Sequence, residues 1–148
     1  MNVAMALSGF DPDLDIWYPS ALPPDVEALV STHAIEQEGG PVPVGWGRRR
    51  RRRPQRCYEA AGAYFREDGV LYTEGRALSS GRWVPHAWLT GLDGHVIDLA
   101  WRVRGVRYLG LQLPDEIVVK AQNRLGRYGP LLPVAIREFG WTPEWLAR

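Results

Sequence analysis

The feature that most constrains the fold is a predicted β-hairpin from Val84 to about Val103, in which two apolar segments flank the turn Leu92-Asp93-Gly94. A three-residue loop with glycine at its left-handed position is a common hairpin connection, and here it pairs Gly91 with His95. The hairpin therefore predicts an antiparallel sheet, and its register determines which side chains share a face.

This register brings a histidine and an aspartate together. His86 faces Ala100 across the hairpin, and Asp98 is its diagonal neighbour on the same face, about 7–8 Å away between backbones and within side-chain reach. The opposite face carries only apolar side chains: Ala87, Leu89, Ile97, Leu99 and Trp101. We expect that face to pack into the core and the histidine face to meet the start of a helix.

That helix is predicted over residues 55–68, with Gly69 placed to end it and a strand over residues 70–78 to follow. Its apolar positions recur at spacings of three and four: Cys57, Ala60, Ala61, Tyr64 and Phe65. Cys57 therefore falls in the first turn of the helix.

Further helices are expected around this core. Pro23-Pro24-Asp25 begins a predicted helix that runs to about Glu38 and carries His33 on its apolar stripe, as a core or boundary residue. Three more are expected nearer the C-terminus: one from Pro114-Asp115-Glu116 to a break at 126–129, and possible ones over 131–139 and 143–146. Trp141 and Trp145 are expected to pack on the body of the domain.

The chain of 148 residues is expected to form a single domain, 1–148. It has an irregular arm at 1–22, a Gly/Pro/Arg-rich loop at 39–54 and a core at about 55–130. The beginning of the chain lacks the features of a signal peptide, and no apolar run approaches the roughly 20 residues of a membrane helix. We therefore expect a cytoplasmic protein without membrane contact.

Cysteine and histidine usage argues against two common kinds of site, an internal disulfide and a metal site. The single cysteine cannot form an internal disulfide, and the three histidines lack the spacing of metal ligands. We expect no metal and no cofactor.

The run Arg48–Arg53 is the most basic segment, although the formal net charge is only +1. It is compatible with a solvated loop, with binding of nucleic acid or an acidic protein, or with electrostatic support of a nearby nucleophile. One function hypothesis is therefore a non-catalytic interaction module that binds through this run.

The other hypothesis is thiol chemistry at Cys57. A cysteine reacts as the thiolate, which a helix N-terminus, the adjacent Arg56 and a neighbouring histidine would all favour. Asp98 stands between Ile97 and Leu99, so its charge needs a partner when buried. Taken singly, Cys57 reads as a small core residue and His86 as a boundary histidine, but their order with Asp98 is that of a nucleophile, a base and an orienting carboxylate.

These three elements resemble the transglutaminase-like and papain-like cysteine hydrolase superfamily. Its pattern is a cysteine at a helix start, a histidine opening a strand and an aspartate on the next strand, here Cys57, His86-Ala87-Trp88 and Val96-Ile97-Asp98. The stretches 72–75 and 108–129 also look like small bacterial and phage proteins of this type. The resemblance covers about residues 55–130.

The resemblance implies an α+β fold with a papain-like or transglutaminase-like core, in which helices pack on a small antiparallel sheet. It implies a hydrolase or acyltransferase that acts on an amide-type bond of a protein, peptide or small amide substrate through Cys57, His86 and Asp98. Gln55 and Trp46 are candidates for the second oxyanion donor, besides the Cys57 backbone N–H. Trp88, Glu74 and Arg76 are candidates for substrate contact, and the last two read otherwise as an exposed strand pair.

Overall fold

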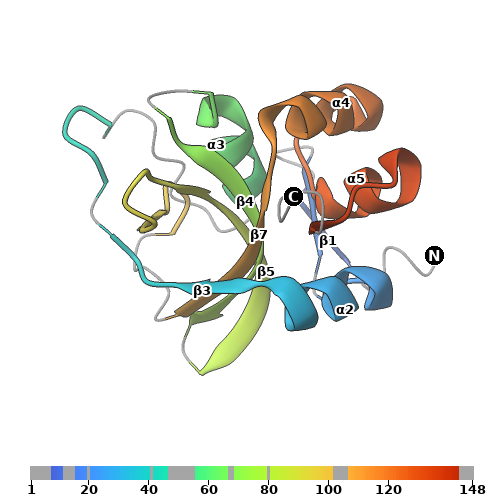
Figure 1. Cartoon of the computed structure of the whole chain (residues 1–148), viewed down its shortest axis with the longest axis horizontal. Coiled ribbons are helices and arrows are strands. Elements are labelled where there is room, and N and C mark those ends of the chain that lie inside the picture. The colour runs from blue at the N-terminus through green and yellow to red at the C-terminus, as the bar shows by residue number, and fades with distance from the viewer. Residues whose placement is uncertain are drawn as a thin grey trace.

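The computed structural model describes residues 8–11, 16–19, 21–40, 42–46, 56–66, 69–79, 81–101 and 107–143. Within these residues, four helices accompany a five-stranded antiparallel sheet and a separate two-stranded pair. The larger sheet curls into a half-barrel (Figure 1). The expected α+β class, with helices packed on a small antiparallel sheet, is confirmed.

The strand order in the larger sheet is β3-β7-β4-β5-β6. Its strands are β3 (Ile35–Gln37), β4 (Leu71–Ser79), β5 (Arg82–Thr90), β6 (Val96–Ile97) and β7 (Arg107–Leu113). Strands β1 (Ser8–Asp11) and β2 (Ile16–Pro19) form the separate antiparallel pair. The N-terminal arm, expected to be irregular, therefore contains paired backbone.

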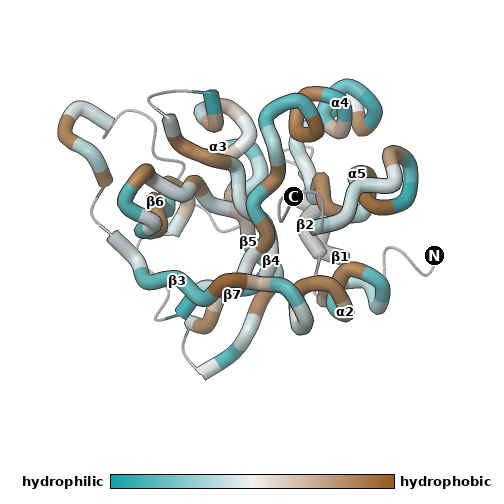
Figure 2. The backbone as a smooth tube through the Cα atoms, in the orientation of Figure 1, coloured by the Kyte–Doolittle hydropathy of each residue, from teal (hydrophilic) through white to brown (hydrophobic). Residues whose placement is uncertain are grey.

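The four helices are α2 (Pro24–His33), α3 (Cys57–Tyr64), α4 (Asp115–Leu125) and α5 (Leu132–Phe139). In Figure 1, α2, α4 and α5 lie to the right of the central strands, whereas α3 lies to their left and packs mainly against β5. Helix α4 alternates between hydrophilic and hydrophobic residues in Figure 2, as expected when one helix face is buried. None of the described helices has the length and apolar character needed to cross a bilayer.

The two edges of the half-barrel meet at one end. The Gly40 N–H donates to the Val96 carbonyl at 2.8 Å, and the Val96 N–H donates to the Glu38 carbonyl at 3.0 Å. A side chain at Gly40 would bring a Cβ within 2.9 Å of the His95 Cβ, so this close approach requires glycine. The contact joins the chain that follows β3 to β6 at this end of the sheet.

Glycine also makes room inside the half-barrel. A Cβ at Gly110 would stand 2.6 Å from the Trp88 ring, and a Cβ at Gly75 would stand 2.1 Å from the Leu109 carbonyl oxygen. Gly75 and Gly110 pair across β4 and β7. These two positions let the strands approach closely and admit the Trp88 indole, which is 1% exposed, to the interior.

Several elements occur where the sequence predicts them. The backbone N–H of Gly91 donates to the His95 carbonyl at 3.0 Å, and Gly94 has φ +83°, which confirms the three-residue hairpin loop and its register. Cys57 lies in the first turn of α3, as expected, although the helix spans Cys57–Tyr64 rather than residues 55–68. Helix α4 ends at Leu125, and Gly126 caps it with φ +75°. Trp141 is completely buried, as expected, whereas Trp145 lies outside the described residues.

Other elements differ from the prediction. Helix α2 ends at His33, which is exposed rather than in the core or at its boundary, because the backbone becomes extended at Ala34 and β3 pairs with β7. The second arm of the hairpin ends as a strand at Ile97 instead of continuing to about Val103. Strand β7 was not predicted at all, although its apolar run before Pro114 is typical of a buried strand.

Candidate active site

Cys57 is the first residue of α3 and is 2% exposed. Its position at the helix N-terminus places the sulfur near backbone N–H groups that have no partner within the helix, and this end of the helix dipole favours negative charge. Helix α3 packs mainly against β5, the strand that carries His86.

His86 lies in β5 opposite Gly75 of β4, and its side chain is 1% exposed. One ring nitrogen, Nε2, lies 2.7 Å from Asp98 Oδ2. The Cys57 side chain also lies close enough to the ring to raise the pKa of His86. Since Nε2 is occupied by Asp98, Nδ1 is the ring nitrogen that remains for the sulfur.

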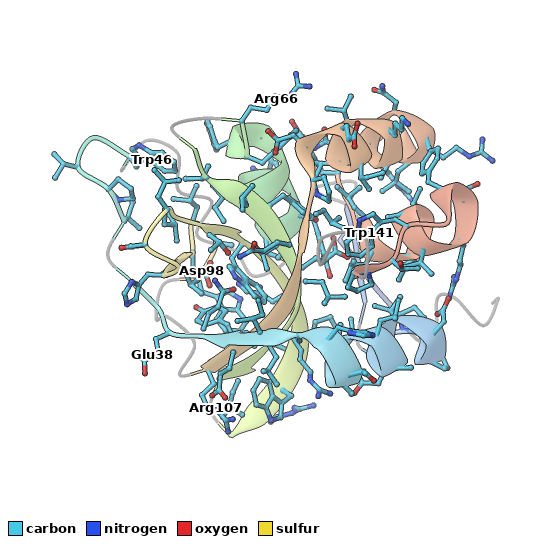
Figure 3. The ribbon with its side chains drawn as sticks, in the orientation of Figure 1. Glu38, Trp46, Arg66, Asp98, Arg107 and Trp141 are labelled. Atoms are coloured by element: carbon cyan, nitrogen blue, oxygen red, sulfur yellow. The ribbon has the colours of Figure 1, made fainter. Side chains whose placement is uncertain are left out.

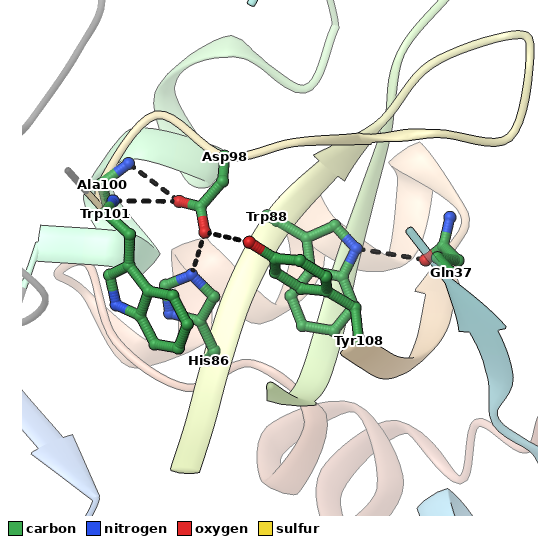
Figure 4. A network of polar contacts seen from close by, with 7 residues as sticks. All are labelled: Gln37, His86, Trp88, Asp98, Ala100, Trp101 and Tyr108. Carbon is green, nitrogen blue, oxygen red and sulfur yellow. Dashed lines mark hydrogen bonds and ion pairs between the residues drawn. The ribbon is translucent and has the colours of Figure 1, made fainter. Parts of the chain in front are cut away.

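Asp98 accepts four hydrogen bonds (Figure 4). Oδ1 accepts from the backbone N–H groups of Ala100 at 3.0 Å and Trp101 at 3.1 Å, and Oδ2 accepts from the Tyr108 hydroxyl at 2.8 Å as well as from His86. The two backbone contacts form a turn that bends the chain immediately after β6. The carboxylate is thus buried with every oxygen satisfied, which fixes its orientation toward the ring.

The bend after β6 moves Trp101 to an unexpected place. Strict alternation predicts Trp101 on the face opposite His86, but this is wrong, because the chain leaves the strand at Asp98. The Trp101 indole instead stacks on the His86 ring, with centroids 3.9 Å apart and an interplanar angle of 28°. It therefore shields the His86–Asp98 pair from water and limits rotation of the imidazole.

The electrostatics of the site favour a charged His86. Burial opposes the positive charge, but the neighbouring Asp98 and Cys57 outweigh this effect and raise the pKa of His86 to about 10. Burial likewise opposes ionisation of Asp98, but His86 and the hydrogen bonds to the carboxylate hold the pKa of Asp98 below its usual range. His86 is therefore an imidazolium and Asp98 a carboxylate at neutral pH.

A polar network continues from the site along the interior of the half-barrel. Trp88 Nε1 donates to Gln37 Oε1 at 3.1 Å, and Gln37 Nε2 donates to Thr90 Oγ1 at 3.1 Å. Thr73 and Thr90 share a hydrogen bond of 2.6 Å between their hydroxyls. Trp88, expected as a substrate contact, is thus buried and bonded to β3.

The sequence reasoning missed Gln37, Trp101 and Tyr108. Tyr108 and Gln37 come from β7 and β3, whose pairing could not be read locally. The apolar run of β7 was the one available signal for Tyr108, since a buried strand places alternate side chains inside. Trp101 stood in the expected hairpin but on the wrong face.

Glu74 and Arg76, the other two candidates for substrate contact, are held by helices on the opposite face of the sheet from His86. The Glu74 carboxylate is 1% exposed and accepts from the backbone N–H groups of Leu131 at 2.8 Å and Leu132 at 3.0 Å, and from the Tyr72 hydroxyl. It therefore caps the start of α5, and the expectation of an exposed strand pair is wrong for Glu74.

Burial is also the main influence on the ionisation of Glu74. It raises the pKa of this carboxyl to about 7, although the hydrogen bonds from Tyr72, Leu131 and Leu132 act in the opposite direction. Arg76 is half-buried, forms an ion pair with Glu27 of α2, and lies with its guanidinium 5.6 Å from the centre of the Trp83 ring. Both side chains thus contribute to the attachment of helices.

The candidates for the second oxyanion donor are not brought to the sulfur by a described contact. Trp46 is 6% exposed and lines a cavity of about 460 Å³ with Pro43, Leu92 and Val96, on the same side of the sheet as Asp98 (Figure 3). The residues that line this cavity do not include Cys57 or His86. Gln55 lies outside the described residues.

The run Arg48–Arg53 also lies outside the described residues, so binding of nucleic acid or an acidic partner stays a prediction. Among the residues that the structure describes, no group of three or more His, Cys, Asp and Glu side chains is placed to hold a metal ion. Comparisons with protein-family models, curated proteins and solved structures find no match to this chain. The interpretation of the site therefore depends on its geometry.

Proposed function

We propose that this protein is a cysteine-dependent hydrolase or acyltransferase that acts on an amide-type bond through Cys57, His86 and Asp98. The observation that carries the proposal is the environment of His86, whose Nε2 lies 2.7 Å from Asp98 Oδ2 while the Cys57 side chain lies close enough to raise the pKa of the ring. A cysteine at a helix start, a histidine on β5 and an aspartate directly after β6 also support a papain-like or transglutaminase-like core.

The charge distribution favours a reactive sulfur. An imidazolium beside a thiol stabilises the thiolate, and the N-terminus of α3 adds to this effect. Asp98 holds Nε2 of the His86 ring and leaves Nδ1 for the sulfur, and Trp101 stacks on the ring. These contacts support a thiolate–imidazolium pair that forms before a substrate binds.

The proposed reaction has two steps. The Cys57 thiolate attacks the carbonyl carbon of an amide, and the resulting oxyanion is stabilised by the Cys57 backbone N–H. As the C–N bond breaks, His86 gives its proton to the leaving amine, which leaves a thioester on Cys57. Neutral His86 then removes a proton from a water molecule or an acceptor amine, which attacks the thioester and releases the sulfur as thiolate.

Substrate access adds one requirement to this mechanism. Cys57 is 2% exposed and His86 is 1% exposed, so a substrate carbonyl cannot reach the sulfur in this arrangement. The proposal therefore requires that the site opens before a substrate reaches Cys57. Small thiol reagents are therefore the appropriate first probes of the site.

Alkylation with iodoacetamide tests the proposal, because Cys57 is the only cysteine in the chain. Near pH 6, where free thiols are almost fully protonated, native Cys57 should react on the order of tenfold faster in the wild type than in His86→Gln, because only the wild type holds an imidazolium beside the sulfur. His95→Gln, a change at an exposed histidine, should react at the wild-type rate. Equal rates in the wild type and His86→Gln would refute the thiolate–imidazolium pair.

A further inference from the structure

Asp98 Oδ2 is shared between two side chains that come from different parts of the sheet. His86 Nε2 lies 2.7 Å from this oxygen and the Tyr108 hydroxyl lies 2.8 Å from it. The other carboxylate oxygen is occupied by two backbone N–H groups. Asp98 cannot rotate without breaking these bonds. Tyr108 and His86 therefore share one acceptor oxygen, and the hydrogen bond of each weakens that of the other.

The fold is arranged so that Tyr108 can reach this oxygen. Tyr108 lies in β7 and His86 in β5, so strand β4 separates them. At the crossing, β4 contributes Ala77, which pairs with Tyr108, and Gly75, which pairs with His86. These small residues let the phenol pass over β4, and the two rings come within 6.2 Å between centroids.

The phenol is also held in place from another side. The Trp88 ring meets it edge-on, with centroids 5.0 Å apart and an interplanar angle of 65°, and Tyr108 is completely buried. Trp88 in turn fits only because Gly110 has no side chain. The position of the Tyr108 hydroxyl is therefore determined by packing, in addition to its hydrogen bond with Asp98.

We propose that Tyr108 is a positioning residue for His86. Its hydroxyl donates a hydrogen bond to the carboxylate oxygen that holds the ring, and this second bond limits how strongly Asp98 retains the His86 proton. The inference rests on the proposed function for the role of His86 as base and acid. His86 must release its proton in one step and take one up in the next. A carboxylate that holds the imidazolium less strongly makes both transfers easier.

Removal of the hydroxyl should strengthen the His86–Asp98 interaction. Asp98 and Cys57 are the titratable groups that act on His86. In Tyr108→Phe, Oδ2 would interact with His86 alone, so the imidazolium should persist to higher pH. Loss of one hydrogen bond to a charged carboxylate should move the His86 titration upward by about 0.5 to 1 pH unit.

The titration is best followed by NMR of the imidazole carbons in full-length Cys57→Ala protein. This background removes the sulfur, so the result does not depend on whether Cys57 is a nucleophile. The chain has three histidines, and the His86 resonance is assigned by its loss in His86→Gln. Tyr72→Phe is the matched control, because Tyr72 is equally buried but its hydroxyl donates a hydrogen bond to Glu74 instead of Asp98.

An upward shift of the His86 titration in Tyr108→Phe, without a shift in Tyr72→Phe, supports the proposal. An unchanged titration, a downward shift, or the same shift in both variants would overturn it. If Tyr108→Phe does not fold, the proposal is tested in protein with native Tyr108, by following the NMR resonances of labelled tyrosine Cζ carbons against pH. The Tyr108 Cζ resonance must then titrate with the His86 midpoint, and a Cζ resonance that ignores His86 would reject the shared oxygen.

Failure of this proposal and failure of the proposed function are distinguishable. If Cys57 in the wild type shows no enhanced alkylation but the His86 titration responds to Tyr108→Phe, the electrostatic arrangement is correct and the reaction is not. If alkylation is enhanced but the titration does not respond, the thiol chemistry holds and Tyr108 has only a packing role.

Discussion

Replacement of His86 by glutamine should remove a part of the stability that depends strongly on pH. The glutamine amide can still donate to Asp98, so the variant keeps one hydrogen bond but loses the charge. The pKa of His86 is raised above its ordinary value, which means that the folded state favours the imidazolium. This stabilisation is complete below pH 6.5 and is lost as the pH rises through about 10.

The size of the pKa shift gives the free energy that the charged His86 contributes to the folded state. Each pH unit between the two values corresponds to about 1.4 kcal/mol, so raising the pKa from 6.5 to about 10 stabilises the folded state by about 5 kcal/mol. Between pH 6.5 and pH 9, about 3 kcal/mol of this contribution should be lost. The difference in free energy of unfolding between wild type and His86→Gln should shrink by that amount over this range.

Urea unfolding at several pH values, followed by tryptophan fluorescence, measures this difference. The matched control is His95→Gln, because the His95 side chain is 51% exposed and contacts Asp93 at the surface. At this exposed position the variant serves as the reference for loss of a histidine that does not belong to the interior pair. A His86→Gln difference that is constant from pH 6.5 to pH 9 would refute the charged pair in the interior.

Two further predictions concern other interior positions. Gly110→Ala should destabilise the fold by about 1–3 kcal/mol in urea unfolding, because its Cβ would stand 2.6 Å from the Trp88 ring; unchanged stability would contradict the close packing. Burial raises the pKa of Glu74 from 4.5 to about 7, so wild-type stability should fall by about 3 kcal/mol across that range. The thermal unfolding of Glu74→Gln should lack this component, and an identical pH dependence in both proteins would argue against a buried carboxyl.

The predictions that succeeded rest on local backbone chemistry. Gly94 in the left-handed region determines the hairpin register, and this register brings His86 beside Asp98. The helix start at Cys57 and the helix end at Gly126 follow in the same way from apolar spacing and from a glycine. Such signals extend over a few residues, so they can be read without knowing the rest of the fold.

The predictions that failed depend on partners distant in sequence. The helix expected to reach Glu38 ends at His33 because β3 pairs with β7, some 70 positions away. Glu74 looked like a surface residue, but α5 covers it and uses its carboxylate as a cap. Trp101 was placed on the wrong face because the hydrogen bonds of Asp98 end the strand, and side-chain hydrogen bonds of this kind override alternation.

By itself, the sequence determined the mixed α+β class, the position of Cys57 at a helix start and the pairing of His86 with Asp98. Tertiary structure alone decided what surrounds that pair: Tyr108 on the shared oxygen, Trp101 on the imidazole ring and the closed end of the half-barrel at Val96. The reason is physical, because turn and helix signals act between neighbours in the chain. The environment that determines the charge of a buried histidine is assembled from strands that meet only when the sheet curls.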